Sequence, residues 1–267
     1  MRRPPSNVFA TCPFDYAVPE AREDPEPSRS QIALGKLIRN TDLTVVFQPI
    51  VRLATGEVFA YEALTRCSVD AYKDPSVLFE RARQEGCCGR LGRTVREVAV
   101  PLCEGVPVFL NVHPRELEEK WLVRPDDPVF MHDSPVFIEI TEAVPLTHFQ
   151  LCRSVLKEVR QRADARLVID DLGAGFSNLR LIADLEPAIV KLDRSLVMNI
   201  HKEQRKQQLV KGIVDMCVNM GAQVVAEGIE LAEELEAIRD TGAHYGQGFL
   251  FARPAFPLPM HDKLERP

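Results

Sequence analysis

The chain has 267 residues, of which 45% are hydrophobic and 27% are charged, and 39 acidic against 33 basic residues give a formal net charge of −6. This is the composition of an ordinary globular protein, long enough to bury a core without disulfides. The acidic excess disfavours a passive binder of duplex nucleic acid, which needs a basic stripe. No apolar run approaches the roughly 18 residues that span a bilayer, and no signal peptide is predicted, so no membrane contact is expected.

The first 30 residues differ in composition from the rest of the chain. They carry prolines at positions 4, 5, 13, 19, 25 and 27 and the mixed-charge run EAREDPEPSRS. Proline at this density removes backbone donors and blocks helices and sheet ladders. We therefore predict a flexible tail over residues 1–30, one folded domain over residues 31–260 and a short C-terminal tail over residues 261–267.

Cysteine and histidine usage indicates neither disulfides nor zinc. The seven cysteines, at positions 12, 67, 87, 88, 103, 152 and 217, are an odd number without a CxxC pair. They favour reduced thiols in a cytoplasmic protein, with a strained redox pair of Cys87 and Cys88 as the alternative. The six histidines are scattered and lack zinc-binding spacing, which disfavours a zinc hydrolase.

Short β-rich apolar runs recur from residue 31 onward, and helical segments lie between most of them. The predicted strands are 43–51, 57–64, 107–112, 136–140, 166–169, 189–192, 223–226 and 246–251, and the predicted helices are 76–86, 91–104, 148–162, 202–220 and 231–241. Residues 52–56 are too few for a crossover helix, so the first two strands should form an antiparallel hairpin. In the fourth helix, the predicted buried face consists of Leu209, Ile213, Met216, Cys217 and Met220.

Eight strands alternating with helices in one domain predict a closed α/β barrel. An open doubly wound sheet is the alternative, although no GxGxxG motif follows the first strand.

Polar residues stand at the carboxyl ends of the predicted strands. They are Glu62, Asn111, Glu139 with Glu142, Asp170 with Asp171, Lys191 with Asp193, Glu227 with Glu230, and Gln247. The carboxyl ends of barrel strands meet at one rim, where the active sites of this fold lie. Carboxylates crowded there with one lysine need divalent cations, and oxygen ligands suit Mg²⁺ or Mn²⁺. Asp170 and Asp171 together could reach two cations, an arrangement that supports phosphoryl displacement.

Each of these residues also has a structural interpretation. Glu62 could pair with Arg66, Asn111 could cap a helix starting near Arg115, Asp170–Asp171 could form a turn, Lys191 could pair with Asp193 on the surface, and Gln247 could close a tight turn. Because all the strand ends contribute to one rim, a shared site is favoured over separate structural roles.

The ordered motifs resemble those of the EAL-domain phosphodiesterases, which hydrolyse cyclic di-GMP to linear pGpG. The motifs are FQPIV (47–51), YEALTR with Glu62-Ala63-Leu64, NVH (111–113), EITE (139–142), DDLGAGFSNL (170–179), VKLD (190–193), AEGIE (226–230) and GQGFLFARP (246–254). The resemblance covers about residues 31–258 and implies a TIM-like barrel whose first strand runs antiparallel to the rest. This agrees with the predicted hairpin.

The resemblance also implies roles for individual residues. It implies that one metal is bound by Glu62, Asn111, Glu139 and Asp170, and that Asp170 bridges to a second metal bound by Asp171 with Glu227 nearby. It implies catalytic roles for Lys191, Glu227, Gln247 and Glu230, with Glu230 supporting Lys191 and the substrate. It further implies substrate contacts by Gln48 and Arg66, and a loop anchor, Glu142, for residues 172–179.

The cofactors and partners follow from the same resemblance. Two Mg²⁺ or Mn²⁺ ions per site, inhibition by Ca²⁺, a homodimer, a regulatory partner acting in trans and a bacterial cytoplasmic location are expected. The alternatives are an inactive cyclic di-GMP receptor of the same fold, a barrel metallohydrolase for another phosphate ester, and a scaffold without a ligand.

The sequence departs from the family's usual pattern at several positions. DDLGAGFSNL stands where DDFGTGYSSL is common, Ala188 where an aspartate is frequent and Cys67 where a tryptophan is common. The substituted loop positions are Leu172, Ala174, Phe176 and Asn178. These changes are expected to affect loop stability, dimer coupling and local contacts. Because no implied metal ligand is replaced, catalysis is expected.

Overall fold

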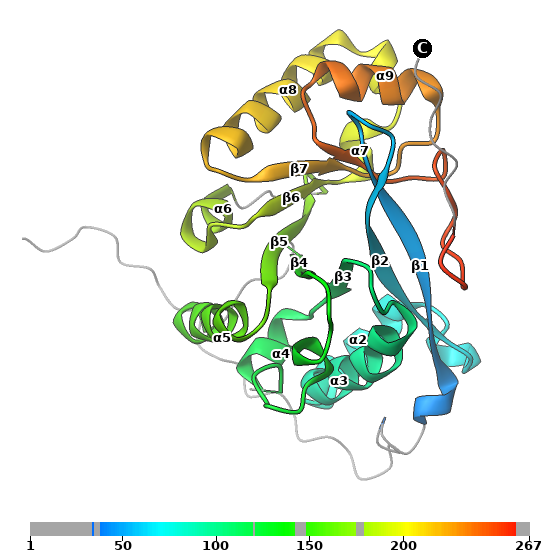
Figure 1. Ribbon diagram of the computed structural model, residues 1–267, viewed down its shortest axis with the longest axis vertical. Helices are drawn as coiled ribbons and strands as arrows, with labels where there is room; N and C mark the ends of the chain where they lie inside the picture. The colour runs from blue at the N-terminus through cyan, green and yellow to red at the C-terminus, as the bar shows by residue number, and fades with distance from the viewer. Residues whose placement is uncertain (1–33, 35–37, 120, 142–147, 175–178, 260–267) are drawn as a thin grey trace, which may run out of the picture. The chain divides into compact units, whose positions relative to one another are not determined.

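The computed structural model describes residue 34 and residues 38–119, 121–141, 148–174 and 179–259 (Figure 1). The predicted tails, 1–30 and 261–267, lie outside the described residues. So do the predicted loop anchor Glu142 and two of the substituted loop residues, Phe176 and Asn178.

Eight strands close into a barrel in chain order (Figure 1). They are β1 (Leu43–Arg52), β2 (Val58–Cys67), β3 (Val108–Asn111), β4 (Val136–Thr141), β5 (Ala165–Leu172), β6 (Ile189–Leu192), β7 (Gln223–Ala226) and β8 (Tyr245–Gly246). β1 runs antiparallel to both β2 and β8, and the remaining neighbours are parallel. The predicted barrel with an antiparallel first strand is confirmed, and the open doubly wound sheet is excluded.

The last strand is shorter than predicted. The sequence pattern indicated a strand over 246–251, whereas β8 ends at Gly246 and the chain then turns, with the Phe251 N–H donating to the Gly248 carbonyl. Gly248 lies so close to the backbone of Ile229 that a Cβ would overlap the Ile229 carbonyl oxygen. The apolar residues after Gly246 therefore pack in a turn rather than continuing the sheet.

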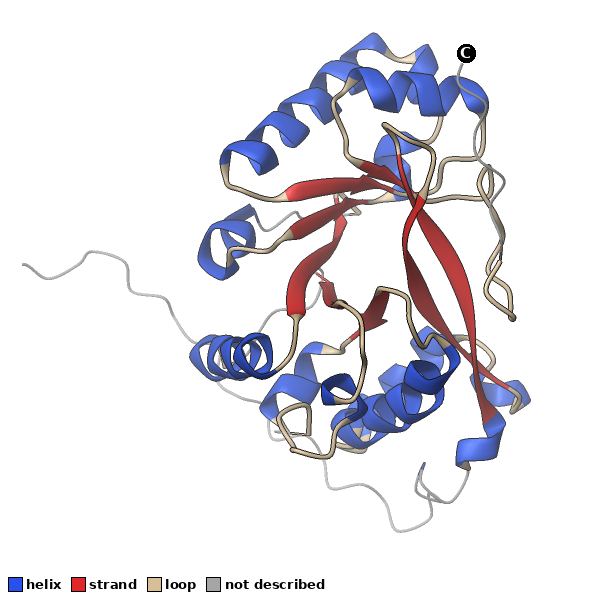
Figure 2. Cartoon of the chain, viewed as in Figure 1, coloured by secondary structure: helices blue, strands red, loops and turns tan. Residues whose placement is uncertain are grey.

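Helices lie outside the strands (Figure 2). They are α2 (Pro75–Gln84), α3 (Cys88–Ala99), α4 (Pro114–Glu118), α5 (Phe149–Arg162), α6 (Leu179–Leu185), α7 (Arg194–Val197), α8 (Gln204–Asn219) and α9 (Ala232–Asp240), with 3₁₀ turns η1 (Asn40–Asp42), η2 (Asp70–Tyr72), η3 (Val100–Leu102), η4 (Pro128–Phe130) and η5 (Ile200–Lys202). The five predicted helices correspond to α2, α3, α5, α8 and α9. α6 and α7 were not predicted because they are too short to show a helical period. In the described part of the chain, no helix has the length and apolar character needed to cross a membrane.

The buried face of α8 differs from the predicted one. Val210, Val214 and Cys217 are buried, whereas Leu209 is 55% exposed and Met220 is 41% exposed. Two adjacent apolar stripes run along this helix with the same 3- and 4-residue spacing. Periodicity alone does not show which stripe faces the core. The predicted face is right at Cys217, partly right at Ile213 and Met216, which are partly buried against the core, and wrong at Leu209 and Met220.

No helix separates β1 from β2, and a C-terminal segment lies along β1 instead. The N–H and carbonyl of Phe47 both bond to Ala255, and the rings of Phe47 and Phe256 lie 6.4 Å apart. The Tyr61 hydroxyl donates to the carbonyl of Pro259. This segment thus extends the barrel wall where the hairpin leaves no helix.

Six cysteines lie among the described residues, and all six are free: Cys67, Cys87, Cys88, Cys103, Cys152 and Cys217. Burial raises the pKa of Cys88 and of Cys103 to about 12, so both are protonated thiols at neutral pH. The structure therefore supports reduced thiols over a Cys87–Cys88 redox pair.

Two layers of side chains fill the barrel. An apolar layer consists of Ile50, Ala60, Phe109, Phe137, Val168, Ile189, Val225 and Tyr245. Two residues further toward the carboxyl ends of the parallel strands stands a polar layer of Gln48, Glu62, Asn111, Glu139, Asp170, Lys191, Glu227 and Gln247. Because side chains alternate along a strand with a period of two, both layers face the interior.

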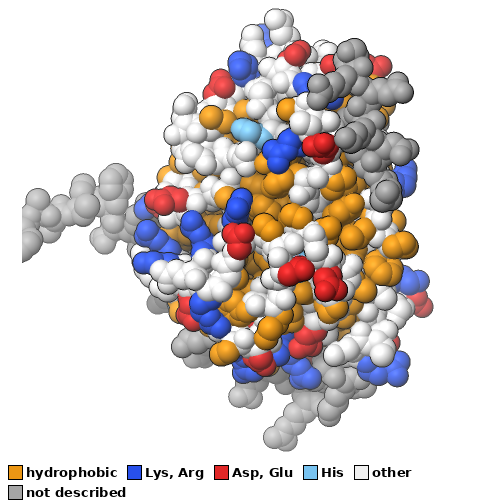
Figure 3. Space-filling view, viewed as in Figure 1, with side chains coloured by type: hydrophobic (Ala, Val, Ile, Leu, Met, Phe, Trp, Pro, Cys, Tyr) orange, Lys and Arg blue, Asp and Glu red, His pale blue; other side chains and the backbone are white. Residues whose placement is uncertain are grey.

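Hydrophobic side chains gather over the middle of the face in Figure 3, and charged side chains of both signs surround them.

Ala188, at the amino end of β6, packs against the apolar layer. It therefore lies at the opposite end of β6 from the polar layer.

Candidate functional site

Lys191 lies at the centre of the polar layer. Its side chain is 1% exposed, and its Nζ lies 2.6 Å from Glu227 Oε1, 2.7 Å from Glu139 Oε1, 3.3 Å from Asp170 Oδ1 and 3.4 Å from Glu62 Oε2. One ammonium group therefore faces four carboxylates. The alternative of a surface pair with Asp193 is wrong, because Lys191 is buried and Asp193 instead caps α7 by accepting from the Ser195 N–H.

Glu62 is held by side-chain amides. Asn111 Nδ2 donates to Glu62 Oε1 at 3.0 Å, and Gln247 Nε2 donates to Glu62 Oε2 at 2.6 Å. Gln247 Nε2 also lies 3.2 Å from Gln48 Oε1, and Gln48 Nε2 donates to the Ala252 carbonyl. These amides join β1, β2, β3 and the end of β8, so Gln247 does more than close a turn.

Two of the structural roles considered from the sequence are wrong: the pairing of Glu62 with Arg66 and the capping of a helix by Asn111. Arg66 Nη1 donates to the carbonyl of Thr65, and no ion pair between Arg66 and Glu62 is present among the described residues. The helix after Asn111 is capped by His113, whose Nδ1 accepts from the Arg115 N–H. Asn111 is therefore free of a capping role, and its side chain bonds to Glu62.

Asp170 and Asp171 are brought together by an unusual backbone conformation. Successive residues of a strand face opposite sides, so Asp171 would normally point away from Asp170. Asp171 instead has φ 63°, and the register between β5 and β6 shifts at this point. The Asp171 N–H donates to Asp170 Oδ1, and Thr141 Oγ1 donates to Asp171 Oδ2.

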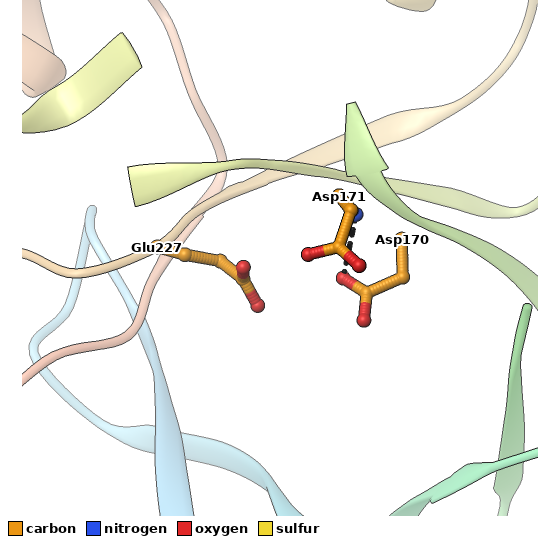
Figure 4. Close-up of side chains that lie close together, drawn as sticks. All are labelled: Asp170, Asp171 and Glu227. Carbon is orange, nitrogen blue, oxygen red and sulfur yellow. Dashed lines mark hydrogen bonds between the residues drawn. The ribbon is translucent and has the colours of Figure 1, made fainter. Parts of the chain in front are cut away.

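This conformation completes an acidic triad of Asp170, Asp171 and Glu227. One carboxylate oxygen from each residue lies within 4.8 Å of the other two. In Figure 4 the three side chains, from β5 and from the loop after β7, extend into the same space. The strained backbone conformation of Asp171 thus places a third carboxylate in the cluster.

The crowding perturbs the acid–base properties of these carboxyl groups. Burial raises the pKa of Asp170 to about 6 and that of Glu227 to about 8, although Lys191 opposes both shifts. Burial and the nearby Glu62 raise the pKa of Glu139 well above its usual range. Burial also opposes ionisation of Glu62, but Lys191 and the amides of Gln247 and Asn111 outweigh it and lower the pKa of Glu62.

The residues of this cluster fit divalent cations. Both carboxylate oxygens of Glu139 are buried without a well-aligned hydrogen bond, although Oε1 lies close to Lys191. Buried carboxylate oxygens without donors are costly unless a counter-charge meets them. The donor set consists of carboxylate and amide oxygens, which suit Mg²⁺ or Mn²⁺. Glu62, Asn111, Glu139 and Asp170 could hold one ion, and the acidic triad could hold a second.

A pH-dependent effect of Mn²⁺ on stability follows from these pKa values. Asp170 and Glu227 titrate higher in the folded protein than when unfolded, so the stability that they contribute below about pH 4 is lost as the pH rises through about 6 and about 8. The pKa of Glu139 is also raised, so Glu139 acts in the same direction. A cation needs the ionised carboxylates and should offset this loss. We expect Mn²⁺ to raise Tm more at pH 8 than at pH 5.5, by on the order of 5 °C.

Thermal unfolding with and without Mn²⁺ at both pH values measures this difference. Glu227→Gln serves as the matched variant, because it removes the group whose pKa is raised to about 8. It should reduce the pH dependence of the Mn²⁺ effect. An equal Mn²⁺ effect at the two pH values in the unmodified protein would contradict the electrostatic description.

Two cavities flank the cluster and share Glu62 and Leu64 in their walls. The first has a volume of about 400 Å³ and is lined by Arg66, Phe79, His113 and Asp171, among others. The rings of Phe79 and His113 are parallel to within 7°, with centroids 6.3 Å apart.

The second cavity has a volume of about 210 Å³, and its walls include Gln48, Arg194, Glu230 and Phe249. The guanidinium of Arg253 lies 4.2 Å from the centre of the Phe249 ring. Each cavity thus combines an aromatic side chain with an arginine.

Glu230 lies in the wall of the second cavity and is exposed. Its Oε1 lies 2.9 Å from Arg194 Nη2, and it is not among the carboxylates within 4.0 Å of Lys191 in the described part of the chain. The structure therefore places Glu230 beside Arg194, a residue that the sequence did not single out.

The fold and the site together define an α/β barrel protein with an acidic cluster that could hold metal at the carboxyl ends of its strands. The sequence matches the family model of the EAL domain over residues 31–254. The chain belongs to the EAL domain family, and the resemblance inferred from its motifs is confirmed.

Named relatives extend this assignment. The chain is 31% identical over 234 residues to the cyclic di-GMP phosphodiesterase PdeR of Escherichia coli, a match that covers 83% of this chain and 35% of PdeR. It is 28% identical over 235 residues to the cyclic di-GMP phosphodiesterase PA2567 of Pseudomonas aeruginosa, covering 83% of this chain and 40% of that protein. The chain thus spans well under half the length of these curated relatives.

Solved structures show the same barrel. The Klebsiella pneumoniae BlrP1 complex with manganese and cyclic di-GMP matches with a TM-score of 0.69 and 32% identity, covering 80% of this chain and 56% of BlrP1. The EAL domain of Xanthomonas citri FimX in complex with cyclic di-GMP matches with a TM-score of 0.71 over 84% of this chain and 91% of that domain. At 19% identity, the FimX match supports the fold alone.

Proposed function

We propose that this protein is a cyclic di-GMP phosphodiesterase that hydrolyses its substrate to linear pGpG with two Mg²⁺ or Mn²⁺ ions. The observation that carries the proposal is the polar layer, in which four carboxylates, three of them buried and that of Glu227 partly buried, face one lysine and Asp171 is turned into the same space. The relatives named as phosphodiesterases support it.

The metals would be held by Glu62, Asn111, Glu139, Asp170, Asp171 and Glu227. When bound, paired cations lower the pKa of a water molecule and offset charge on the phosphoryl oxygens. Lys191, with Nζ among four carboxylates, would hold these ligands in place and orient the attacking water by donating to it. Gln247 would fix Glu62 and position the water or a phosphate oxygen through its amide.

Substrate binding would use both cavities. Arg66, in the wall of the first cavity, has the forked geometry suited to a phosphate. Gln48 and Glu230 would contact the substrate from the second cavity. Cyclic di-GMP carries two guanines on a ring closed by two phosphodiesters, and it would place one base in each cavity with the scissile phosphate near Glu62.

Three further features are proposed from the family resemblance. They are a homodimer, a regulatory partner acting in trans, and Glu142 as the anchor of loop 172–179. Light scattering of the purified chain tests the dimer. The cytoplasmic location is proposed on the same ground.

Chromatography after incubation with cyclic di-GMP and Mn²⁺ tests the function. We expect pGpG to accumulate with repeated turnover. Tight binding without pGpG after hours would instead establish the inactive receptor. A preference by orders of magnitude for another phosphodiester in a substrate panel would establish the other hydrolase.

Calcium should bind without supporting hydrolysis. Ca²⁺ is larger than Mg²⁺ and accepts more ligands in looser geometry, so it can occupy carboxylate sites without the positioning that the reaction needs. A BlrP1 structure is a complex with calcium and cyclic di-GMP. In the same assay, Ca²⁺ should give no pGpG and should inhibit the Mn²⁺-supported reaction; equal turnover with both ions would contradict the assigned metal chemistry.

A further inference from the structure

The short helix α7 (Arg194–Val197) lies between the loop after β5, the strand that carries Asp170 and Asp171, and the loop after β7, which carries Glu227. It follows β6, the strand of Lys191, after a single residue, Asp193. One loop follows β5, on which Asp171 is the second-last residue, and begins at Gly173, and the other follows β7 and begins at Glu227. None of the α7 residues is among the proposed metal ligands.

Arg194 joins α7 to the loop after β7. Its Nη2 lies 2.9 Å from Glu230 Oε1, and its aliphatic stem packs on Gly228, which directly follows Glu227. A Cβ at Gly228 would overlap the Arg194 stem, and Gly228 has φ +70°, which favours glycine. The loop can approach α7 this closely only because glycine stands next to Glu227.

Leu196 joins α7 to the loop after β5 in a similar way. A Cβ at Gly173, two residues after Asp171, would lie 2.5 Å from Leu196 Cδ1, and Gly173 has φ +104°. The N–H of Asp193 donates to the Leu172 carbonyl at 3.1 Å. Both loops therefore meet α7 at a glycine.

A buried glutamate strengthens the connection to the loop after β7. Glu234 is 3% exposed and accepts from the backbone N–H groups of Glu230, Leu231 and Asn199, at 3.0, 3.2 and 2.7 Å. Asn199 lies two residues after the end of α7. The loop is thus tied to the α7 segment both through Arg194 and through Glu234.

We propose that α7 is a brace that fixes the spacing of Asp171 and Glu227, with Arg194 and Leu196 as positioning residues. This inference rests on the proposed metal centre. Three crowded carboxylates repel one another, so their loops would separate without a rigid link. The second cation would then find its ligands too far apart, and its affinity would fall.

The test compares Arg194→Met and Leu196→Ala with the unmodified chain. Arg83→Met is the matched control, because it removes an exposed Arg–Glu ion pair of 2.7 Å on α2, away from both loops. Calorimetric titration with Mn²⁺ measures the affinity of each ion. Amide hydrogen exchange of the metal-free proteins measures the two loops without reference to catalysis.

We expect both α7 variants to bind the weaker Mn²⁺ roughly 10-fold less tightly, the usual cost of losing a residue that orients a ligand. Exchange should accelerate around Ile229 in Arg194→Met and around Ala174 in Leu196→Ala, while Arg83→Met behaves as the unmodified chain. At saturating Mn²⁺, Leu196→Ala should recover kcat with an unchanged KM, because Leu196 does not line either cavity.

Unchanged Mn²⁺ affinity and unchanged loop exchange in both α7 variants would overturn the brace. If the unmodified chain releases no pGpG but the α7 variants still show weaker Mn²⁺ binding and faster exchange, the brace stands and the proposed function fails. If the unmodified chain releases pGpG and the variants bind Mn²⁺ normally, the proposed function stands and the brace fails.

Discussion

Glu62→Ala is expected to abolish hydrolysis of cyclic di-GMP and leave the protein folded. Glu62 lies in the polar layer above the apolar one, so its removal takes away a ligand and leaves the apolar layer intact. Loss of one preorganised electrostatic group from an active site typically costs on the order of 10²–10³ in kcat. A lost metal ligand should cost at least as much.

Glu62→Gln sharpens this experiment. It keeps the size of the side chain but removes the charge that Lys191, Asn111 and Gln247 now stabilise. Glu57→Ala, an exposed residue just before the same strand, is the matched control and should retain full activity. Turnover at the unmodified rate in Glu62→Ala, with a normal Mn²⁺ titration, would remove Glu62 from the proposed metal centre.

Lys191→Met is expected to cause the largest loss of stability. It leaves four carboxylates, three of them buried and that of Glu227 partly buried, without their ammonium partner, and breaking a buried ion pair from one side typically costs about 3–5 kcal/mol. The loss in the metal-free protein should be greater near pH 8, where Asp170 is ionised and Glu227 is about half ionised, than near pH 5, where protons neutralise both. Urea unfolding at the two pH values measures it.

Two additions make the Lys191 result specific. Mn²⁺ should restore part of the lost stability at pH 8 but not the activity, because the proposed roles of Lys191 include orienting the attacking water. A second substitution, Glu139→Gln, should also restore part of the stability, since it removes one of the repelling charges. A metal-free Lys191→Met protein as stable as the unmodified chain at pH 8 would contradict the electrostatic account of the cluster.

These expectations share one physical cause. The ionised carboxylates of Asp170, Glu139 and Glu227 destabilise the metal-free protein, as their raised pKa values indicate, whereas that of Glu62 is stabilised by Lys191 and two amides. Bound cations relieve this repulsion, and the relief contributes to the free energy of metal binding. Carboxylates at a site of this kind lower the stability of the metal-free fold and raise its affinity for metal. A single carboxylate substitution can therefore abolish function and stabilise the fold.

The barrel and the polar layer could be predicted from the sequence because both follow from short-range patterns. The hairpin was evident from the five residues between two β-rich runs. The polar layer follows from alternation, since Glu139 stands two residues after Phe137 and Lys191 two residues after Ile189. Residues at this spacing on parallel strands must face the same interior.

Other features depend on contacts that no local pattern encodes. The two apolar stripes of α8 are equivalent in spacing, and only packing against the barrel selects the one with Val210. The turn of Asp171 toward the triad depends on a positive φ that alternation would not predict. The Arg194–Glu230 pair joins residues from two different loops. The glycines at 173 and 228 were visible in the sequence, but only the structure shows that α7 lies against both.

Anomalous diffraction from crystals soaked in Mn²⁺ at pH 8 tests the central claim most directly. The proposed centre predicts two anomalous peaks, one among Glu62, Asn111, Glu139 and Asp170 and one at the acidic triad. A cluster without anomalous density, with Lys191 still contacting all four carboxylates, would contradict it.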